Sequence, residues 1–182
     1  MKHSLSLIAV FALMLSTPAM ASLEQGNTEV ALDFGMTELD SNTFDQTGLT
    51  MGFRGGYLFT DLFELEGQFS STSADDSVAG IDMDLDATTL FVNGLFNFRP
   101  TEEIVPYVLV GIGTTDVDIE VAGFKVDDSA TATQIGFGSR FYFGQEKKVA
   151  VRVEVAFVNE DTFDADSTHT NILGSLSWKL GS

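Results

Sequence analysis

Bulky apolar residues alternate with small or polar residues over eight stretches of this chain, and no other feature restricts the fold as much. The stretches are residues 29–36, 49–59, 63–70, 89–98, 106–114, 134–143, 149–157 and 172–180. A period of two residues is typical of a β-strand whose faces meet different surroundings. A length of about ten residues is typical of a strand that crosses a membrane at a tilt. The sequence therefore predicts an all-β protein, although alternation alone does not say which face is buried.

The connections between these stretches alternate in length. The short connections are residues 60–62, 99–104 and 144–148. The long ones are windows that contain most of the 27 acidic residues, at 37–48, 71–86, 116–130 and 158–168. Short turns on one side and long loops on the other are the layout of a bacterial outer-membrane barrel with both termini in the periplasm. We therefore expect an eight-stranded antiparallel up-and-down transmembrane β-barrel with short periplasmic turns and long extracellular loops.

The N-terminus has the pattern of an export signal. Lys2 and His3 precede an apolar run over residues 5–15, and Ala19-Met20-Ala21 forms an A-x-A cleavage site. The apolar run is shorter than the roughly 20 residues of a membrane-spanning helix. We expect residues 1–21 to be a cleaved signal peptide and residues 22–182 to form one barrel domain. An exported chain without cysteine is not a small disulfide-stapled domain.

Three features indicate that the apolar faces meet lipid. These faces are bulky and uncharged in all eight stretches, whereas the polar faces are rich in Gly, Ala, Ser, Thr and Asn, which suits a narrow lumen. Aromatic residues also gather at the short-turn ends, where they predict an interfacial girdle. The girdle residues are Tyr57, Phe59, Phe63, Phe96, Phe98, Phe141, Phe143 and Trp178. The alternative is a soluble periplasmic barrel that turns its apolar face inward around a ligand.

Three stretches resemble a known family. They read PYVLVGIG (106–113), GFGSRFYFG (136–144) and LGSLSWKL (173–180), and they are similar to the outer-membrane protein A/X type of eight-stranded barrel, often called the outer-membrane β-barrel or porin-family domain. The resemblance covers the mature chain. It implies a monomer in the cell outer membrane, in contact with outer-membrane lipid and lipopolysaccharide. The alternating end Leu176-Trp178-Leu180 is similar to the segment that the barrel-assembly machinery reads in such proteins.

Several charged residues fall on the polar faces, and we expect them in the lumen. They are Asp33, Arg54, Glu64, Glu66, Arg140, Arg152, Glu154 and Lys179. Buried charges are costly unless paired, and an eight-stranded barrel is only wide enough to be filled by side chains. We therefore predict a salt-bridged plug, with Glu66 beside Arg54 or Arg152. The alternative is a gated ion path, as in a small low-conductance porin.

The fifth stretch alternates less cleanly than the others. In it, Tyr107 and Leu109 fall on the same face as Gly111 and Gly113. Val108, Val110 and Ile112 form the opposite face.

Acidic residues at every second position raise the possibility of a metal site. The candidates are Asp82, Asp84, Asp86, Asp116, Asp118 and Glu120. A calcium loop that began at Asp82 would need glycine and glutamate where Ala87 and Asn93 stand. Apolar residues between the carboxylates instead predict strands, and VAGFKV (121–126) predicts a tight turn, so two hairpins extend beyond the membrane. We expect no cofactor and weak calcium binding at most. The other interpretations are a repulsive solvated surface or divalent-ion bridging to lipopolysaccharide.

Charge and histidine content exclude two further classes of function. A net charge of −18 leaves no basic face for nucleic acid. A lipid-modifying enzyme needs a paired serine and histidine. The predicted mature chain has one histidine, His169, and Asn171 stands where similar deacylases have serine. We expect no enzyme but a structural or surface-interaction role, in envelope integrity, adhesion or contact with a host through an extracellular partner.

Overall fold

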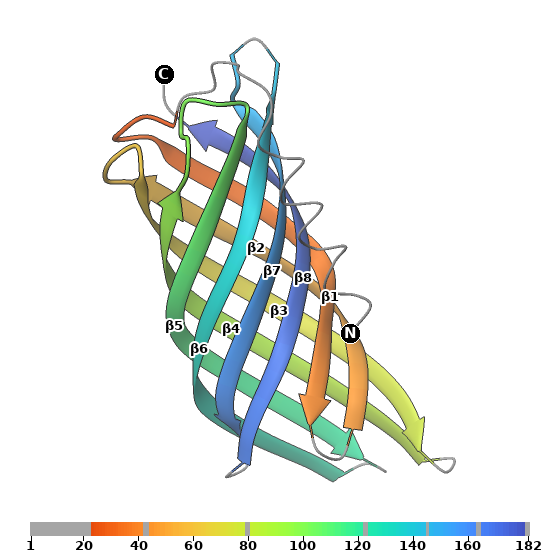
Figure 1. The fold of residues 1–182 in the computed structure, drawn as a ribbon. Coiled ribbons are helices and arrows are strands. Elements are labelled where there is room, and N and C mark those ends of the chain that lie inside the picture. The colour runs from red at the N-terminus through yellow and green to blue at the C-terminus, as the bar shows by residue number, and fades with distance from the viewer. Residues whose placement is uncertain are drawn as a thin grey trace, which may run out of the picture.

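The chain forms a closed antiparallel β-barrel in which each strand pairs with its neighbours in sequence and β1 pairs with β8 (Figure 1). The computed structural model describes residues 23–41, 44–78, 81–121, 124–144, 146–162 and 165–180. The strands are β1 (Thr28–Ser41), β2 (Phe44–Leu58), β3 (Phe63–Val78), β4 (Ile81–Asn97), β5 (Ile104–Val121), β6 (Phe124–Phe143), β7 (Val149–Thr162) and β8 (Ala165–Leu180). In this part of the chain no helix is long and apolar enough to span a membrane. The predicted signal peptide, residues 1–21, lies outside the described residues.

The two faces of the sheet are opposite in character to those of a soluble barrel. Apolar side chains such as Phe53 and Ile112 are more than half exposed on the outer surface, at 57% and 61%. The residues between them point inward, and Arg54 is 2% exposed in the lumen. An apolar exterior with a polar interior is the arrangement of a membrane barrel. A soluble barrel with an apolar cavity is therefore excluded.

The four acidic windows differ from the expected long loops. β1 ends at Ser41 and β2 begins at Phe44. Most residues of the other three acidic windows likewise belong to strands. β3 and β4 pair as far as Val78 and Ile81. The physical reason is that the alternation continues through the acidic segments, so they can extend the barrel hairpins. We call this the long-hairpin end.

The sheet divides at the long-hairpin end. Pairing of β2 with β3 stops at Leu49 and Ser73, and pairing of β6 with β7 stops at Ala132 and Glu160. Strands β3 to β6 remain paired beyond these points. We call this four-stranded sheet the β3–β6 extension; it comprises residues 74–78, 81–86, 116–121 and 124–131.

The opposite end is closed by an apolar floor. The three short turns, which follow β2, β4 and β6, lie together with the end of β8 (Figure 1), and we call this the short-turn end. The segment that precedes β1 crosses it, because the N–H of Leu23 donates to the carbonyl of Pro100 at 3.0 Å. The Leu23 side chain is buried in a cluster whose other members are Leu58, Val105, Tyr142 and Ala150. The lumen therefore rests on a small hydrophobic layer at this end.

Candidate functional site in the barrel interior

The first interior cluster is built around Arg140 of β6. Its guanidinium contacts Glu64 of β3 at 2.7 Å and Glu29 of β1 at 3.0 Å. Asn97 accepts a further hydrogen bond from Arg140, and the hydroxyl of Tyr142 donates to Glu29 at 2.8 Å. All of these side chains are buried. We call them the Arg140 cluster, which lies just above the apolar floor.

The second cluster contains two arginines, Arg54 of β2 and Arg152 of β7. Arg54 contacts Asp33 at 2.8 Å, Glu154 at 3.0 Å and Glu66 at 3.2 Å. Arg152 contacts Glu66 at 2.6 Å and Glu154 at 3.3 Å. Glu66 therefore bridges the two arginines that the sequence offered as its alternative partners. We call these five residues the Arg54–Arg152 cluster.

Tyr107 of β5 connects the two clusters. Arg140 and Arg152 are directly opposite each other on β6 and β7, which would place like charges side by side. The Tyr107 ring lies 4.9 Å from each guanidinium carbon, a distance at which the ring face attracts a cation. Its hydroxyl donates to Glu154 at 2.6 Å and accepts from Arg152 at 3.2 Å. Tyr107 thus separates two cations and stabilises both.

Gly138 makes room for this tyrosine. A Cβ atom at Gly138 would lie 2.5 Å from the Tyr107 hydroxyl oxygen and 2.6 Å from the Val153 carbonyl oxygen. Real Cβ atoms do not approach other atoms so closely. A glycine opposite the ring is therefore a geometric requirement of the interior.

The interior carries more negative than positive groups. Three guanidinium groups face five carboxylates, those of Glu29, Asp33, Glu64, Glu66 and Glu154. Glu64 Oε1 and Arg54 Nη2 are buried without a hydrogen-bond partner among the described residues. Most polar atoms of the clusters are paired, but these two have no hydrogen-bond partner there, whereas nearly all buried polar atoms of proteins have one.

Uncharged layers fill the lumen between these clusters and the long-hairpin end. The amides of Gln68, Asn93 and Gln134 bond to one another. Further along the strands, the hydroxyls of Thr37, Thr50 and Thr72 lie within hydrogen-bond distance of one another, and Thr37 donates to Asn171 at 2.7 Å. Side-chain hydrogen bonds therefore join strands of the barrel at these two levels of the lumen.

The sequence placed most of these groups on the polar face but did not single out every member. Glu29, Tyr107, Tyr142 and the amide residues were missing from the predicted network. Strand parity would have found them, because each occupies an inward position. Lys179 was included in that network; it lies half-buried near the end of β8, in register with Glu29.

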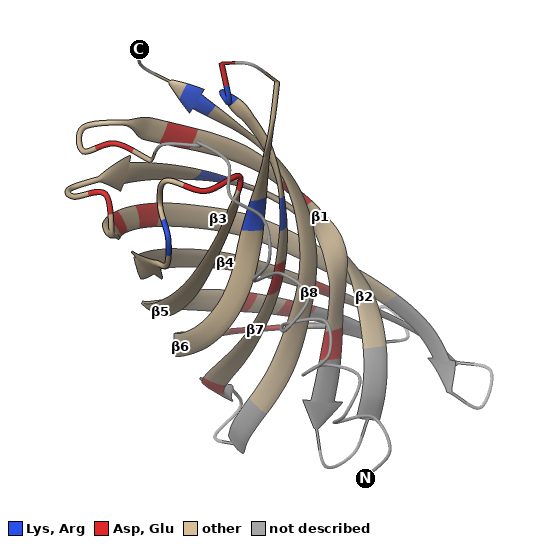
Figure 2. Ribbon diagram, turned by 45° about the horizontal axis from the view of Figure 1, so that its top comes forward, with Lys and Arg blue, Asp and Glu red and all other residues tan. Residues whose placement is uncertain are grey.

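The predicted aromatic girdle lies on the outer surface near the short-turn end. Tyr57, Phe59 and Phe63 are about half exposed. Edge-to-face contacts join Tyr57 to Phe59 at 5.0 Å and Phe63 to Phe96 at 5.1 Å. The other predicted members are exposed or partly exposed: Phe98, Phe141, Phe143 and Trp178. Lys147, Lys148, Lys179 and Arg99 lie at the same end (Figure 2).

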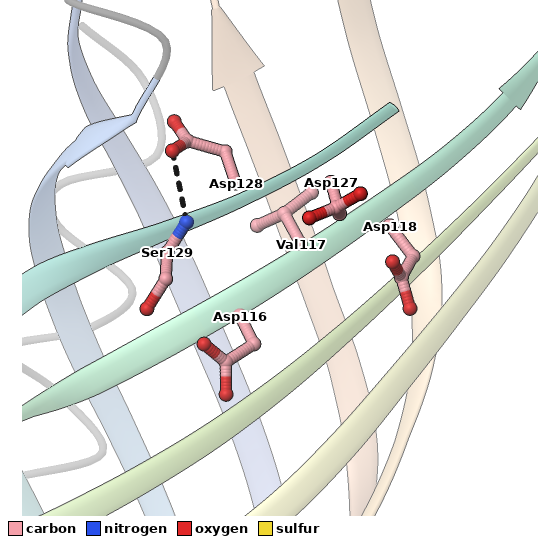
Figure 3. Close-up of a pocket in the computed structure, with 6 residues that line it drawn as sticks. All are labelled: Asp116, Val117, Asp118, Asp127, Asp128 and Ser129. Atoms are coloured by element: carbon pink, nitrogen blue, oxygen red, sulfur yellow. Dashed lines mark hydrogen bonds between the residues drawn. The ribbon is translucent and has the colours of Figure 1, made fainter. Parts of the chain in front are cut away.

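The acidic candidates for a metal site are spread over the β3–β6 extension. Asp86, Asp118 and Asp127 are directly opposite one another on β4, β5 and β6. A hollow of about 430 Å³ between β5 and β6 is lined by Asp116, Val117, Asp118, Asp127, Asp128 and Ser129 (Figure 3). The side chains of Asp82, Asp84 and Glu120 lie outside the described part of the structure. Within that part, no three acidic or histidine side chains are close enough to hold a metal ion.

His169 points into the lumen near the long-hairpin end. Its Nδ1 lies 3.6 Å from a carboxylate oxygen of Glu160, and both residues are buried. Among the described residues, Nδ1 has no hydrogen-bond partner. A hydroxyl nucleophile activated by histidine requires a direct bond between the two groups. The described contacts of His169 include no such bond at Nδ1.

The fold and the charged interior define an integral β-barrel of the outer membrane. The sequence profile of the outer membrane protein beta-barrel domain matches residues 7–179, and the chain belongs to this family. Membership implies a location in the outer membrane. A comparison with curated protein sequences found no match.

Solved structures show the same architecture. Neisserial surface protein A superimposes with a TM-score of 0.73 at 10% identity, over 86% of this chain and 100% of the other. Ail, the attachment invasion locus protein of Yersinia pestis, has a TM-score of 0.58 at 17% identity, over 86% and 99%. OprG from Pseudomonas aeruginosa has a TM-score of 0.54 at 11% identity, over 90% and 100%. At these identities the likeness shows the shared fold.

Proposed function

We propose that this protein is a non-conducting outer-membrane barrel with a salt-bridged plug, and that its acidic hairpins make contacts outside the cell. The supporting observation is that the ion pairs cross the lumen. Arg54 of β2 reaches Glu154 of β7, and Arg140 of β6 reaches Glu64 of β3. Neither pair of strands is adjacent in the barrel. Side chains that reach across the interior between non-adjacent strands support the proposal of a closed lumen.

The outer surface supports a role in lipid and at the cell surface. We propose that the apolar band contacts outer-membrane lipid and lipopolysaccharide in a monomer placed there by the barrel-assembly machinery, after export by residues 1–21. We further propose that the aromatic girdle lies at the periplasmic interface. The hairpins then project outward with a strong negative charge, and they serve envelope integrity, adhesion or contact with a host. One similar barrel, Ail, is named for attachment and invasion.

Conductance across a planar bilayer tests the plug. The wild-type barrel is expected to insert without steady single-channel current. Arg54→Glu places a fourth carboxylate among Asp33, Glu66 and Glu154, so it is expected to lower the unfolding midpoint without opening a channel. Arg99→Glu is the control, because Arg99 lies in an exposed turn. A regular single-channel current through the wild-type barrel would contradict the plug and favour a small porin.

We propose no catalytic role for His169. Its nearest described ionic neighbour is a carboxylate, which orients an imidazole but is no nucleophile for acyl transfer. Release of fatty acid from lipid A or phospholipid by the wild-type protein, and its loss in His169→Ala, would contradict this proposal.

A further inference from the structure

We propose that His169 and Glu160 bind a divalent transition-metal ion of the Zn²⁺ type at the rim of the lumen. The ion joins β8 to β7 through the imidazole Nδ1 of His169 and the carboxylate of Glu160. This inference goes beyond the plug and the contact role proposed above, because it requires neither a closed lumen nor an extracellular partner.

The two side chains come from adjacent strands at the point where the closed barrel ends. His169 of β8 is directly opposite Val158 of β7, and Glu160 lies two residues further along β7. Glu160 is also the last residue of β7 in register with β6, where it faces Ala132. Both side chains are buried, since His169 is 6% and Glu160 is 9% exposed. The pair therefore lies at the rim of the lumen on the long-hairpin side.

Each of the two side chains has a buried polar atom without a hydrogen bond. Among the described residues, His169 Nδ1 and Glu160 Oε2 have no hydrogen-bond partner. Nearly all buried polar atoms in proteins have one, so two such atoms in neighbouring side chains call for an explanation. The nearest atoms of the two groups, Nδ1 and Oε1, are 3.6 Å apart, which is too far for a hydrogen bond between them.

The same distance is close to the separation of two ligands of one zinc ion. Zinc lies about 2.0–2.1 Å from a histidine nitrogen and about 2.0–2.2 Å from a carboxylate oxygen, and a tetrahedral angle between them places the two ligands roughly 3.4 Å apart. The observed 3.6 Å requires only a small adjustment of either side chain to reach that value. An ion between the groups would satisfy the lone pair of Nδ1 and the charge of the carboxylate together.

The chemistry of the two ligands selects the kind of ion. An imidazole with a carboxylate suits Zn²⁺ and its transition-metal neighbours, whereas Ca²⁺ and Mg²⁺ prefer oxygen ligands alone. The chain has no cysteine, so no thiolate competes for the ion. Two protein ligands leave the other positions of a tetrahedral ion to water. Binding is therefore reversible, and it stabilises the barrel because the pair is brought together only in the folded chain.

The first experiment uses the full mature barrel, without a histidine tag, in lipid nanodiscs. ZnCl₂ is added in a buffer that does not bind zinc, and the imidazole ¹⁵N resonances are followed by NMR. His169 is the one histidine of the predicted mature chain, so both resonances belong to the proposed site. Zinc is expected to shift the Nδ1 resonance more than the Nε2 resonance and to saturate at one ion per barrel. Calcium at the same concentration is expected to shift neither.

This experiment does not depend on any variant. Zinc bound loosely by the surface acids does not report at the imidazole, so it is not mistaken for the site. No shift of the His169 resonances, a shift of Nε2 alone, or an equal shift with calcium would overturn the proposal.

A matched pair of variants tests the carboxylate. Glu160→Gln keeps the size of the side chain and removes its charge, and it is expected to weaken zinc binding at His169 by at least about tenfold, since loss of a group that only supports a ligand already costs that much. Glu38→Gln makes the same change at an exposed position of β1 and is expected to alter binding by less than about twofold. Equal binding in Glu160→Gln and Glu38→Gln would remove Glu160 from the site and overturn the proposal.

A stability measurement tests the histidine. Saturating zinc is expected to raise the urea midpoint of the wild-type barrel, and His169→Gln is expected to lose this rise. Each protein is compared with itself with and without zinc, so a change in its intrinsic stability does not affect the result. Heat-modifiable gel mobility establishes that the variant is folded. A rise in His169→Gln as large as in the wild type would contradict the proposed site, whatever the conductance of the barrel.

Discussion

Acidic side chains have opposite surroundings in the interior clusters and in the β3–β6 extension. In the interior, Glu66 lies between two guanidinium groups at 2.6 and 3.2 Å and is excluded from solvent. In the extension, Asp118 lies between Asp86 and Asp127 in register, on a partly exposed surface. Water screens the second arrangement and not the first. The difference shows that alternating carboxylates can be either a structural core or a repulsive edge, and that the residues across the ladder decide which.

The largest expected effect is removal of an interior cation. Arg152→Met would leave Glu66 and Glu154 with one guanidinium instead of two, and we expect a loss of about 3–5 kcal/mol in unfolding free energy. Urea titration of the refolded barrel, followed by heat-modifiable gel mobility, measures the change. The control is Arg99→Met, which breaks an exposed pair with Glu102 and is expected to cost about 0–1 kcal/mol. Equal losses of unfolding free energy in the two variants would contradict the expected difference between a buried and an exposed charge.

A smaller effect is expected when the space behind Tyr107 is filled. Gly138→Ala would push a methyl group against the tyrosine hydroxyl and the Val153 carbonyl, at an expected cost of about 1–3 kcal/mol. Gly67→Ala is the matched control, because a Cβ at Gly67 meets no atom within 4 Å. The same urea titration compares them. A neutral Gly138→Ala would show that the tyrosine is not held tightly between the arginines.

Removal of the Tyr107 hydroxyl tests how much its hydrogen bond to Glu154 contributes to the free energy of unfolding. Tyr107→Phe keeps the ring between Arg140 and Arg152 but deletes the bond to Glu154, and we expect a loss of about 1–2 kcal/mol. Tyr57→Phe on the outer surface is the control, with an expected change within about 0.5 kcal/mol. The urea concentrations at the unfolding midpoints of Tyr107→Phe and Tyr57→Phe are compared with that of the wild type. A loss in Tyr57→Phe as large as in Tyr107→Phe would contradict the assignment.

The smallest effect, and one of opposite sign, is expected in the acidic row. Asp127→Asn removes the repulsion with Asp118, so it is expected to stabilise the barrel by up to about 1 kcal/mol at low salt. The gain should vanish at high ionic strength, because salt screens exposed charges. Glu38→Gln, away from the row, is expected to change little at either salt concentration. A destabilised Asp127→Asn would show that the row is held by attraction and not merely tolerated.

The barrel itself could be predicted because the face of each residue depends on local parity. Parity assigned Asp33 and Arg54 to the lumen without any knowledge of their neighbours. It could not say that Arg140 and Arg152 would be directly opposite each other, since a period of two residues contains no information about register across the ladder. The position of Tyr107 between the two arginines follows from that register and was beyond the reach of the sequence.

The acidic windows show a different limit. Their charge favoured solvated loops, whereas the apolar residues between Asp82 and Asp86 favoured strands, and both tendencies were present in the same few residues. The outcome depended on whether each hairpin had a neighbour to pair with. β4 and β5 are such neighbours, because they pair with each other as far as Met83 and Val121. Pairing partners distant in sequence therefore decided between loop and strand.

The ion pairs that cross the lumen also bear on the timing of folding. Arg140 and Glu29 are 111 residues apart in the chain, and Arg54 and Glu154 are 100 apart. Glu29 belongs to the first strand, so its contact with Arg140 cannot form until β1 has been brought close to β6 and β7. Contacts of such long range slow folding, because the loop between their partners must first be closed. We therefore expect the charges that pair across the lumen to stay hydrated until the seam between β1 and β8 closes, so that dehydration of the lumen becomes part of the final step of folding.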